Sequence, residues 1–382
     1  MDMEWLLEIP FTFEWILLYV FGLTACIQLF MYWFFFSRLA FYKPNAKNQT
    51  TPPVSVIICA KNEYLNLEEN LPFFLNQDYP NFEVLVINDG SDDESELLLH
   101  GMRANFKQLR FINLQKNINF FQGKKFPLSI GIKEARHEIV LLADADCRPA
   151  SNHWISAMME GFDPTAEIVL GCGLYQKKPG LLNLLIRYDT FFIALQYLSF
   201  ALTGNAYMGV GRNLAYRREL FFRNKGFTSH YTIMSGDDDL FINQAATRHN
   251  VRVLPIPQGQ TISLPKETLG KWFHQKRRHM TTGKHYKPKF KFILGLFGIT
   301  QLTFYPLFII IMACCLLSTI GLVAAAIYTI RMISMLIIFY RAGKKINQSR
   351  LSLCSPLFDA VITGLNLIFA FAAMFFNSNK WK

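Results

Sequence analysis

The stretch Ile139-Val140-Leu141-Leu142-Ala143-Asp144-Ala145-Asp146 decides the expected fold of this chain. Its aliphatic, partly β-branched run is typical of a buried strand, which would deliver the carboxylates of Asp144 and Asp146 at its C-terminal end. Residues two apart in an extended chain project to the same side, and open α/β sheets bind ligands at the carboxyl ends of their strands. The pair is therefore a candidate site for Mg²⁺ or Mn²⁺ holding a diphosphate, with a solvated turn as the alternative.

The composition indicates a membrane protein. Of the 382 residues, 51% are hydrophobic and 18% are charged, and 36 are Phe; the mean hydropathy is +0.18. This is too apolar for a simple soluble enzyme. The net charge of +11 favours cytoplasmic flanks that face anionic membrane lipids. A basic channel for phosphates is the second interpretation, and no nucleic-acid partner is expected.

Neither the cysteines nor the histidines predict a zinc site. The seven cysteines show no Cys-x-x-Cys spacing and several lie in apolar runs, so we expect reduced thiols in the core or facing lipid. His274, His279 and His285 follow one another at spacings of five and six residues, which is not a metal-ligand pattern.

The N-terminal region predicts a retained membrane span. Residues 1–15 carry acidic but no basic side chains, and residues 16–36 carry no charge, which is long enough to cross roughly 30 Å of hydrocarbon. Arg38, Lys43 and Lys47 follow, so we expect residues 1–15 outside the cytoplasm and the following chain inside. A cleaved signal peptide, the alternative, would need a basic start and a shorter apolar core.

Beyond a polar linker over residues 37–52, strand-like and helix-like segments alternate. The expected strands are Val54–Ala60, Phe82–Asn88, Leu109–Leu114, Ile139–Ala143, Ile168–Leu174 and Val251–Ile256. The alternation predicts a cytoplasmic α/β domain over residues 53–290, built on a mainly parallel, doubly wound sheet. Ser91-Asp92-Asp93-Glu94 fits a capping box that opens a helix.

Two segments of this domain are expected near the membrane surface. Leu181–Leu202 is strongly apolar, but Arg187, Asp189 and Gln196 interrupt it, so we predict a domain helix packed at the membrane face instead of a span. Residues 266–291 hold nine Lys or Arg residues and form a basic juxtamembrane belt.

The C-terminal region, residues 291–382, predicts three further spans near 293–317, 320–338 and 357–376. Arg331 lies within the second and should face a protein interior, a cavity or the headgroups. A basic loop, placed inside, contains Arg341, Lys344, Lys345 and Arg350. Four spans put both termini outside, whereas the basic tail with Lys380 and Lys382 argues for the cytoplasm. An interfacial or re-entrant C-terminal segment is the alternative.

Other polar residues follow the expected strands. Ala60-Lys61-Asn62-Glu63 ends the first strand, and Asn88-Asp89-Gly90-Ser91 ends the second. Such side chains at neighbouring strand ends suit a nucleoside, although each is also a common turn sequence. Gly123-Lys124-Lys125 precedes a helix, where a lysine suits a phosphate; a solvated lysine pair is the alternative.

Together these motifs, in this order, resemble family 2 glycosyltransferases with the GT-A fold. The resemblance is to membrane-bound members, such as the catalytic subunits of cellulose and poly-N-acetylglucosamine synthases. It rests on Pro53–Glu63, Asn88–Ser91, Gly123–Lys124, Ala143–Asp146, the Gly-rich segment Gly204–Asn213, the acidic segment Ser235–Leu240 and the basic segment Gln275–His279. The match extends over about residues 53–282, and the flanking spans also fit.

The resemblance implies an inverting transfer from a nucleotide-sugar and assigns residues to each role. Asp237 would be the catalytic base, with Asp238 as the fallback and Asp239 as a supporting carboxylate. Asp144 and Asp146 would hold Mg²⁺ or Mn²⁺. The donor-binding positions are Ala60, Asn62, Glu63, Asp89, Lys124 and Asp144. The positions that would contact the acceptor or the diphosphate are Arg212, Gln275, Arg277 and Arg278.

Two positions depart from the family pattern. His279 stands where the basic motif has Trp, and Gly236 replaces an acidic residue before Asp237. In processive synthases the Trp belongs to the acceptor site, so His279 weakens an expectation of long-chain synthesis. Helix capping is the alternative role for the acidic cluster.

The sequence, with this resemblance, thus predicts a membrane-anchored enzyme that moves a sugar from a nucleotide-sugar to a lipid or lipid-linked acceptor. A UDP-linked donor is expected. A processive polysaccharide synthase with a glycan acceptor is the runner-up. A catalytically inactive membrane scaffold is the alternative from another class, against which the intact Asp144, Asp146 and Asp237 argue.

Overall fold

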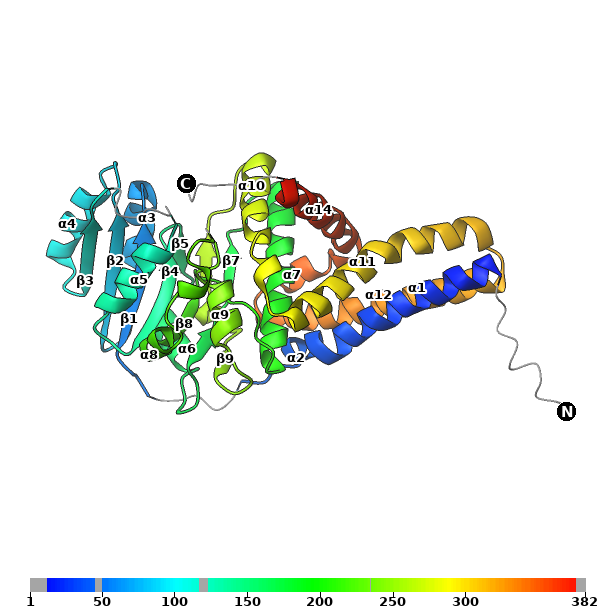
Figure 1. The fold of residues 1–382 in the computed structure, drawn as a ribbon, viewed down its shortest axis with the longest axis horizontal. Helices are drawn as coiled ribbons and strands as arrows, with labels where there is room; N and C mark the ends of the chain where they lie inside the picture. The colour runs from blue at the N-terminus through cyan, green and yellow to red at the C-terminus, as the bar shows by residue number, and fades with distance from the viewer. Residues whose placement is uncertain (1–11, 45–49, 117–122, 234, 376–382) are drawn as a thin grey trace.

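The computed structural model describes residues 12–44, 50–116, 123–233 and 235–375. An α/β body contains two sheets, and a bundle of long helices extends from one side of it (Figure 1). The start of α1 (Phe13–Phe30) lies at the tip of this bundle, far from the sheets.

The α/β body is built on a seven-stranded sheet in the order β3-β2-β1-β4-β8-β6-β9. The first four strands in this order are parallel, whereas β8 is antiparallel to both β4 and β6. The bounds are β1 Val54–Ala60, β2 Phe82–Asp89, β3 Leu109–Leu114, β4 Ile139–Asp144, β6 Ile168–Leu170, β8 Leu214–Arg217 and β9 Val251–Val253. The predicted mainly parallel α/β sheet is confirmed. Its chain order reverses between β1 and β4, where such sheets bind ligands.

A second sheet, in the order β5-β10-β7, corrects two of the expected strands. The single strand expected over Ile168–Leu174 is wrong, because the chain divides into β6 and β7 (Gly173–Tyr175), which belong to different sheets. The strand expected over Val251–Ile256 is shortened to β9, and β10 (Thr261–Ser263) follows it. β5 (Cys147–Pro149), β8 and β10 match no expected strand. Strands of three or four residues are too short to show a clear alternation in the sequence.

Helices cover both faces of the main sheet. Val56 and Ile58 of β1 pack in a core with α3, α4 and α6, whereas Ile57 and Cys59 pack in a core with α5 and α7. This alternation follows from the two-residue period of a strand and explains why β1 is buried along its whole length. The helix bounds are α3 Tyr64–Leu75, α4 Ser95–Asn105, α5 Lys125–Glu134, α6 Trp154–Met159, α7 Leu181–Leu202, α8 Arg218–Arg223 and α9 Asp239–Ala245.

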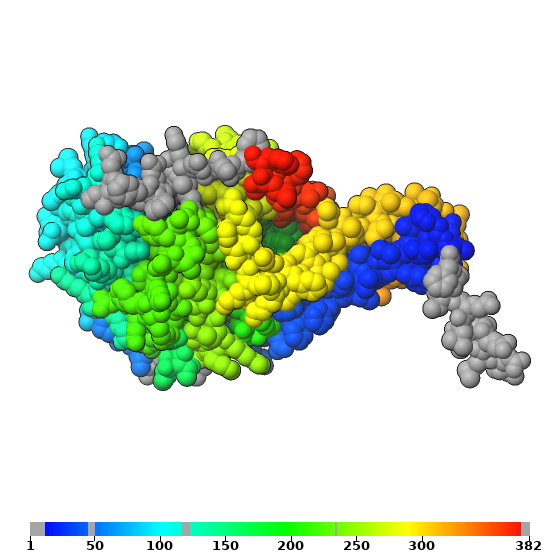
Figure 2. All heavy atoms as spheres, in the orientation of Figure 1, coloured from blue at the N-terminus to red at the C-terminus, as the bar shows by residue number. Residues whose placement is uncertain are grey.

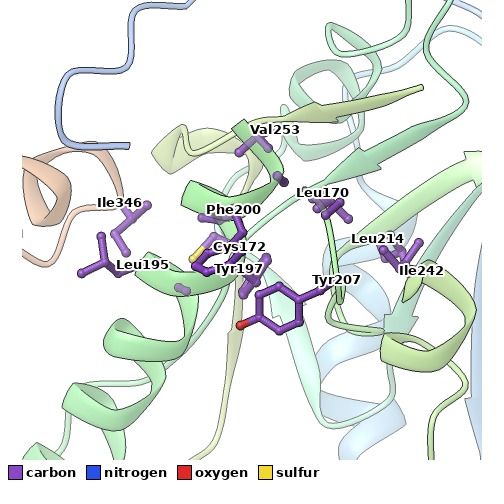
Figure 3. Close-up of a cluster of buried hydrophobic side chains, with 14 of the residues drawn as sticks. Leu170, Cys172, Leu195, Tyr197, Phe200, Tyr207, Leu214, Ile242, Val253 and Ile346 are labelled. Atoms are coloured by element: carbon purple, nitrogen blue, oxygen red, sulfur yellow. The ribbon is translucent and has the colours of Figure 1, made fainter. Parts of the chain in front are cut away.

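The apolar helix α7 joins the α/β body to the helical bundle. Figure 3 shows Tyr197 and Phe200 of α7 in one buried cluster with Leu170 of β6 and with Ile346, which follows α12. The Tyr197 hydroxyl donates a hydrogen bond to the Gly171 carbonyl at 2.7 Å. The apolar character of α7 is therefore explained by burial in protein, as expected for a domain helix.

Among the residues that the structure describes, four helices are long and apolar enough to cross a membrane, as predicted. They are Phe13–Ala40 (α1, η2 Met31–Phe36 and α2 Ser37–Ala40 in succession), α11 Pro288–Cys315, α12 Thr319–Lys345 and α14 Ser355–Phe375. The polar linker expected from residue 37 therefore begins later, because residues 37–40 continue the helix. Side chains fill the interior between α1, α11 and α12; they include Leu18, Phe21, Ala25, Phe304, Ile311 and Ala324.

A buried ion pair holds the bundle together beside this core. The Arg331 guanidinium donates hydrogen bonds to Asp359 Oδ2 at 2.5 Å and to Gln28 Oε1 at 2.8 Å. Asp359 also accepts from Gln301 Nε2 at 3.0 Å and from the Tyr305 hydroxyl at 2.7 Å. The expectation that Arg331 faces a protein interior, one of three alternatives, is confirmed. Its partner Asp359 lies within the fourth expected span and was not singled out by the sequence.

The helix α14 does not extend along the bundle as the other three do. Phe358, near its start, packs edge-on against Tyr188 of α7 at 5.4 Å between ring centroids, and Phe369 packs against Trp272 of α10 (Leu269–Met280) at 5.3 Å. Figure 1 shows α14 running toward α10. These contacts attach α14 to α7 and α10. The basic tail lies outside the described residues.

Candidate active site

Polar residues from three strands meet at the carboxyl edge of the main sheet. In the parallel register, Cys59 of β1 pairs with Asp144 of β4, and Ala60 pairs with Asn88 of β2. Asp89 is the last residue of β2 and is buried. The ends of β1, β2 and β4 are therefore aligned, so that the residues following each strand share one edge.

The buried thiol of Cys59 lies beneath this edge. All seven cysteines are free, as expected. Burial raises the pKa of Cys59 to about 12, so the thiol stays protonated. The charged groups near enough to act on this pKa are Lys124, Asp237, Asp144 and Asp89. The sheet edge thus gathers residues from four separate parts of the chain.

Lys124 links two of the predicted carboxylate sites. It precedes α5 and is 9% exposed. Its ammonium donates a hydrogen bond to Asp144 Oδ1 and lies 3.8 Å from Asp237 Oδ2. Burial by itself lowers the pKa of Lys124, but the carboxylates of Asp144 and Asp237 hold it well above its ordinary value. The lysine therefore remains charged between the end of β4 and the acidic cluster.

Asp144 and Asp146 differ in their electrostatics. Burial alone raises the pKa of Asp144, but the adjacent Lys124 ammonium, with Arg212 and Arg278, lowers it below its ordinary value. The Asp144 side chain is 38% exposed, so it faces an open space. Burial and the nearby charge of Asp144 raise the pKa of Asp146. A cation beside the pair would relieve this repulsion between like charges.

This pair fits a divalent metal that is completed by substrate. Within the part of the chain that the structure describes, no group of three or more His, Cys, Asp or Glu side chains is arranged to hold a metal. Mg²⁺ commonly binds through one or two carboxylates and takes its other ligands from phosphates and water. Two carboxylates at a strand end, Asp144 and Asp146, match that donor set.

The three carboxylates of the acidic cluster have different surroundings. Asp237 contacts Lys124 and its side chain is 14% exposed. Asp238 accepts hydrogen bonds from the Gly211 N–H at 2.7 Å and from the Asp239 N–H at 2.8 Å, at the N-terminus of α9. Asp239 is buried and accepts from Thr282 Oγ1 and from the Tyr286 hydroxyl. Helix capping therefore occupies Asp238, while Asp237 faces Lys124.

Gly236 has a conformational reason for its departure from the family pattern. Its φ is +96°, and a Cβ at this position would lie 2.5 Å from Leu240 Cδ1. Few residues other than glycine adopt such a backbone. An acidic residue would not fit before Asp237 in this turn.

Asp238 should make the stability of the protein depend on pH. Burial and the charges of Asp237 and Asp239 raise its pKa from 3.8 to about 8, so the folded state holds its proton more tightly than the unfolded state. This stabilisation is complete below about pH 4 and is lost as the pH rises toward 8. Asp238→Asn cannot titrate, so its melting temperature should fall less steeply than that of the wild type between pH 5 and 8. Parallel melting curves for the two proteins would contradict the assignment.

Lys125 supports the chain just before the acidic cluster. Its ammonium donates hydrogen bonds to the carbonyls of His230, Ile233 and Ser235 at 2.5–2.7 Å. Lys125 is 3% exposed, so the interpretation of Gly123-Lys124-Lys125 as a solvated lysine pair is wrong. Three carbonyls held by one cation fix the path of the segment that leads to Asp237.

Arg212 forms the cationic side of the site. Its guanidinium lies over the Tyr175 ring, 4.6 Å from the ring centroid, and donates to the Gly173 carbonyl at 3.0 Å. A Cβ on Gly173 would lie 2.4 Å from Arg212 Nε, so only glycine allows this approach. Arg212 acts on the pKa values of both Asp144 and Asp146, which places positive charge beside the candidate metal ligands.

The helix α10 carries the predicted basic motif toward the same place. Gln275 Nε2 donates to the Tyr175 hydroxyl at 3.0 Å, and Arg278 is near enough to Asp144 to lower its pKa. Arg277 instead contacts the His274 ring one turn earlier, at 3.3 Å. The structure thus brings Gln275 to the site through its contact with Tyr175, and Arg278 through the effect of its charge on Asp144.

His279 borders the same open space. It is exposed, yet crowding by protein, followed by the charges of Arg278, Lys276 and Arg212, holds its pKa well below the ordinary value. Its imidazole is therefore neutral at pH 7. Lys276 itself is bound by both carboxylate oxygens of Asp189 at 2.9 Å, which fastens α10 to α7.

The loops after β1 and β2 are tied together. The Asn62 N–H donates to Ser91 Oγ at 2.9 Å, and Asn62 Oδ1 accepts from the Asp92 N–H at 2.7 Å. The capping box expected from Ser91 is wrong, because α4 has Glu94 at its N-cap. The Ser91 hydroxyl instead donates to Asn88 Oδ1 at 2.5 Å. Asp89 lies 3.7 Å from Lys61 in an ion pair.

Glu63 lies at the N-cap of α3 and is 8% exposed. Its carboxylate accepts a hydrogen bond from Asn66 Nδ2. The structure therefore brings Ala60, Asn62, Glu63 and Asp89 to one corner of the sheet edge, where their donor-binding role remains a prediction.

Sequence reasoning missed several residues that contact the predicted ones. Tyr175 lies under the Arg212 guanidinium, and Lys125 holds the segment before Asp237. Thr282 and Tyr286 both donate hydrogen bonds to Asp239. Only Lys125 had a local signal, its position beside Gly123-Lys124. The others meet their partners across more than 35 residues of sequence, which no spacing rule reports.

The mainly parallel sheet, the polar residues at its carboxyl edge and the apolar helices are those of a membrane-associated enzyme of the GT-A class. Residues 139–342 match the family described as Glycosyl transferase family group 2, and residues 55–222 match Glycosyl transferase family 2. The chain therefore belongs to the family 2 glycosyltransferases.

Comparison with known proteins supports this family and fold. Poly-β-1,6-N-acetyl-D-glucosamine synthase of Staphylococcus epidermidis is 29% identical over 119 residues, 30% of this chain and 28% of the synthase. The synthase of Staphylococcus aureus is 30% identical over 118 residues, 30% of this chain and 27% of the relative. The matched stretch thus spans less than a third of these curated relatives.

A solved mannosyltransferase from Pyrobaculum calidifontis, in complex with GDP-Man and Mn²⁺, has the same fold. The structures superpose with a TM-score of 0.56 over 92% of this chain and 98% of the other, at 20% identity.

Proposed function

We propose that this protein transfers a sugar from a nucleotide-sugar to an acceptor hydroxyl at the membrane, with its active site in the cytoplasm. The position of Lys124 between Asp144 and Asp237 carries this proposal. One ammonium contacts the carboxylate on the donor side and the carboxylate proposed as the base. Such an arrangement suits a reaction in which negative charge develops on a departing diphosphate.

In the proposed reaction, Asp237 takes the proton of the acceptor hydroxyl while the acceptor oxygen bonds to the anomeric carbon. The bond from that carbon to the diphosphate oxygen breaks, its electron pair leaves on the nucleoside diphosphate, and the configuration inverts. Lys124, Arg212 and Arg278 supply positive charge on this side of the site. Mg²⁺ or Mn²⁺ bound by Asp144 and Asp146 would supply further neutralisation of the leaving group.

The donor is proposed to be a nucleotide-sugar held by the loops after β1 and β2, through Ala60, Asn62, Glu63 and Asp89. The similar mannosyltransferase was solved with GDP-Man and Mn²⁺, which supports this donor class and a divalent metal. UDP-linked sugars are the first donors to test, followed by GDP-mannose.

The acceptor is proposed to be a lipid or a lipid-linked sugar. Side chains fill the interior between α1, α11 and α12, which favours a reaction at the membrane surface over the passage of a polymer between these helices. A processive synthase with a glycan acceptor is the second candidate, since the matched relatives are poly-β-1,6-N-acetyl-D-glucosamine synthases. The two candidate functions differ in the length of the product. A ladder of polymers made from a radiolabelled donor would favour the processive synthase over transfer to a lipid acceptor.

The full-length protein in membranes should release nucleoside diphosphate from one sugar donor in the presence of Mn²⁺ or Mg²⁺. EDTA should abolish the release, and added metal should restore it. Asp146→Asn should weaken the response to metal, because one of the two proposed ligands becomes a poor one. Release that is unchanged in EDTA would contradict the metal assignment. Failure with all common donors and lipid acceptors would favour the inactive-scaffold alternative.

Removing the Lys125 ammonium should slow turnover without abolishing folding. Lys125→Met leaves three carbonyls of the segment before Asp237 without their shared donor, and a displaced catalytic group can cost about 10²-fold in rate. We expect kcat to fall more than the affinity for the donor changes. Lys133→Met, an exposed lysine on the same helix, is the matched control. Equal kcat for both variants would overturn this positioning role.

A further inference from the structure

A second cationic pocket lies where α7 meets the end of α12, and it shares no residue with the candidate active site. Its volume is about 490 Å³, within the range of small-molecule sites. Lys177, Arg187 and Arg350 provide three cations, and none of its lining residues is Asp or Glu. This contrasts with Arg331 and Lys276, each of which is matched by a carboxylate. The pocket therefore has an unbalanced positive charge.

Arg187 gives the pocket a partly satisfied guanidinium. Its Nη2 donates a hydrogen bond to Gln348 Oε1 at 2.8 Å. The Arg187 Nε is buried and has no hydrogen-bond partner among the described residues. A buried donor without a partner is uncommon in folded proteins, and a guanidinium with a free edge suits the oxygens of a phosphate. Asn347 and Ser349 add polar groups to the lining.

Apolar side chains also line the pocket. Leu184, Leu351 and Cys354 line it, and the adjoining Leu353 and Leu357 are 58% and 66% exposed. These residues adjoin α12 and α14, two helices apolar enough to cross a membrane. A ligand here would meet both cations and apolar side chains.

The pocket also adjoins the C-terminal end of α12, a helix that is apolar enough to cross a membrane. It is built around the turn that follows α12, whose last turn carries Lys344 and Lys345. Basic residues at the end of a membrane helix face the anionic headgroups of the cytoplasmic leaflet. The charge, the apolar part of the lining and this location therefore agree on one kind of ligand.

We infer that this pocket binds the phosphate of an anionic membrane lipid, with the guanidinium groups of Arg187 and Arg350 on the phosphate and the acyl chains along the apolar side chains of the lining. The inference does not depend on the proposed sugar transfer. It identifies the ligand by its phosphate ester and its apolar tail.

Native mass spectrometry of the full-length protein in detergent tests this site. The protein is titrated with phosphatidylglycerol, with phosphatidylcholine and with inorganic phosphate as a competitor. We expect wild-type protein to bind one phosphatidylglycerol in preference to phosphatidylcholine. Arg350→Gln should weaken that binding about fivefold, as expected for one headgroup-facing cation. Lys344→Gln, an exposed lysine near the same turn that does not line the pocket, should bind as the wild type does.

Arg350 is exposed, so its replacement should leave folding intact, and Arg187→Gln combined with Arg350→Gln should remove the preference entirely. An equal loss in Lys344→Gln would show that general surface charge attracts the lipid and would overturn the site. Unchanged binding in Arg350→Gln and in the double variant would overturn it as well. Tight binding of inorganic phosphate without any preference for phosphatidylglycerol would replace the lipid with a free anion and overturn the inference.

Discussion

Asp237→Asn should abolish sugar transfer while leaving donor binding intact. If Asp237 is the base, its amide replacement cannot accept the proton of the acceptor hydroxyl, and general-base catalysis commonly contributes about 10²- to 10⁴-fold in rate. The side chain keeps its size, so the 3.8 Å approach to Lys124 should be largely kept. The measurement is the rate of diphosphate release with acceptor present, together with the affinity for the nucleotide-sugar by calorimetry.

Asp238→Asn provides the comparison within the same cluster. Its side-chain oxygen can still accept from the N–H groups of Gly211 and Asp239, and the proton-bound form of Asp238 is already favoured by its raised pKa of about 8. We therefore expect a much smaller loss of activity than in Asp237→Asn. Activity that survives in Asp237→Asn and disappears in Asp238→Asn would move the base to Asp238.

Breaking the buried ion pair between Arg331 and Asp359 should strongly destabilise the protein. The two side chains are 0% and 2% exposed. Removal of one partner leaves a buried charge uncompensated, which costs about 3–5 kcal/mol. Arg331→Met and Asp359→Leu should each lower the melting temperature of the detergent-solubilised protein and shift its chemical unfolding to lower denaturant.

The double variant Arg331→Met/Asp359→Leu should recover much of this loss, because an apolar pair leaves no charge unpaired. Arg223→Met is the matched control: Arg223 pairs with Glu167 at 2.6 Å but is 53% exposed, and exposed pairs contribute only about 0–1 kcal/mol. Single variants as stable as this control would show that the buried pair does not support the bundle.

The local pattern of the sequence predicted the regular parts of the fold. The strand at Val54–Ala60 and the helix Leu181–Leu202 have the predicted bounds, since apolar runs contain enough residues for their period and length to be recognised. The shorter strand Leu109–Leu114 has the predicted bounds as well. The number and order of the four membrane-type helices also follow from local apolar length.

The arrangement of the carboxylates required the tertiary structure. The sequence singled out Lys124, Asp144 and Asp237 as parts of separate motifs. It did not show that one ammonium contacts both carboxylates. It likewise placed Arg331 in an apolar segment without its partner Asp359. Each of these contacts joins residues from different elements, and their pairing depends on how the elements pack.

By itself, the sequence Ile139–Asp146 determined a buried strand with one acid at its end and a second just beyond it, because aliphatic periodicity and chain direction are local properties. Only the tertiary structure decided what surrounds those acids. Lys124 pairs with Asp144, Arg212 and Arg278 act on its pKa, and the charge of Asp144 raises the pKa of Asp146. Electrostatic interactions depend on distance through space, which the order of residues along a chain does not specify.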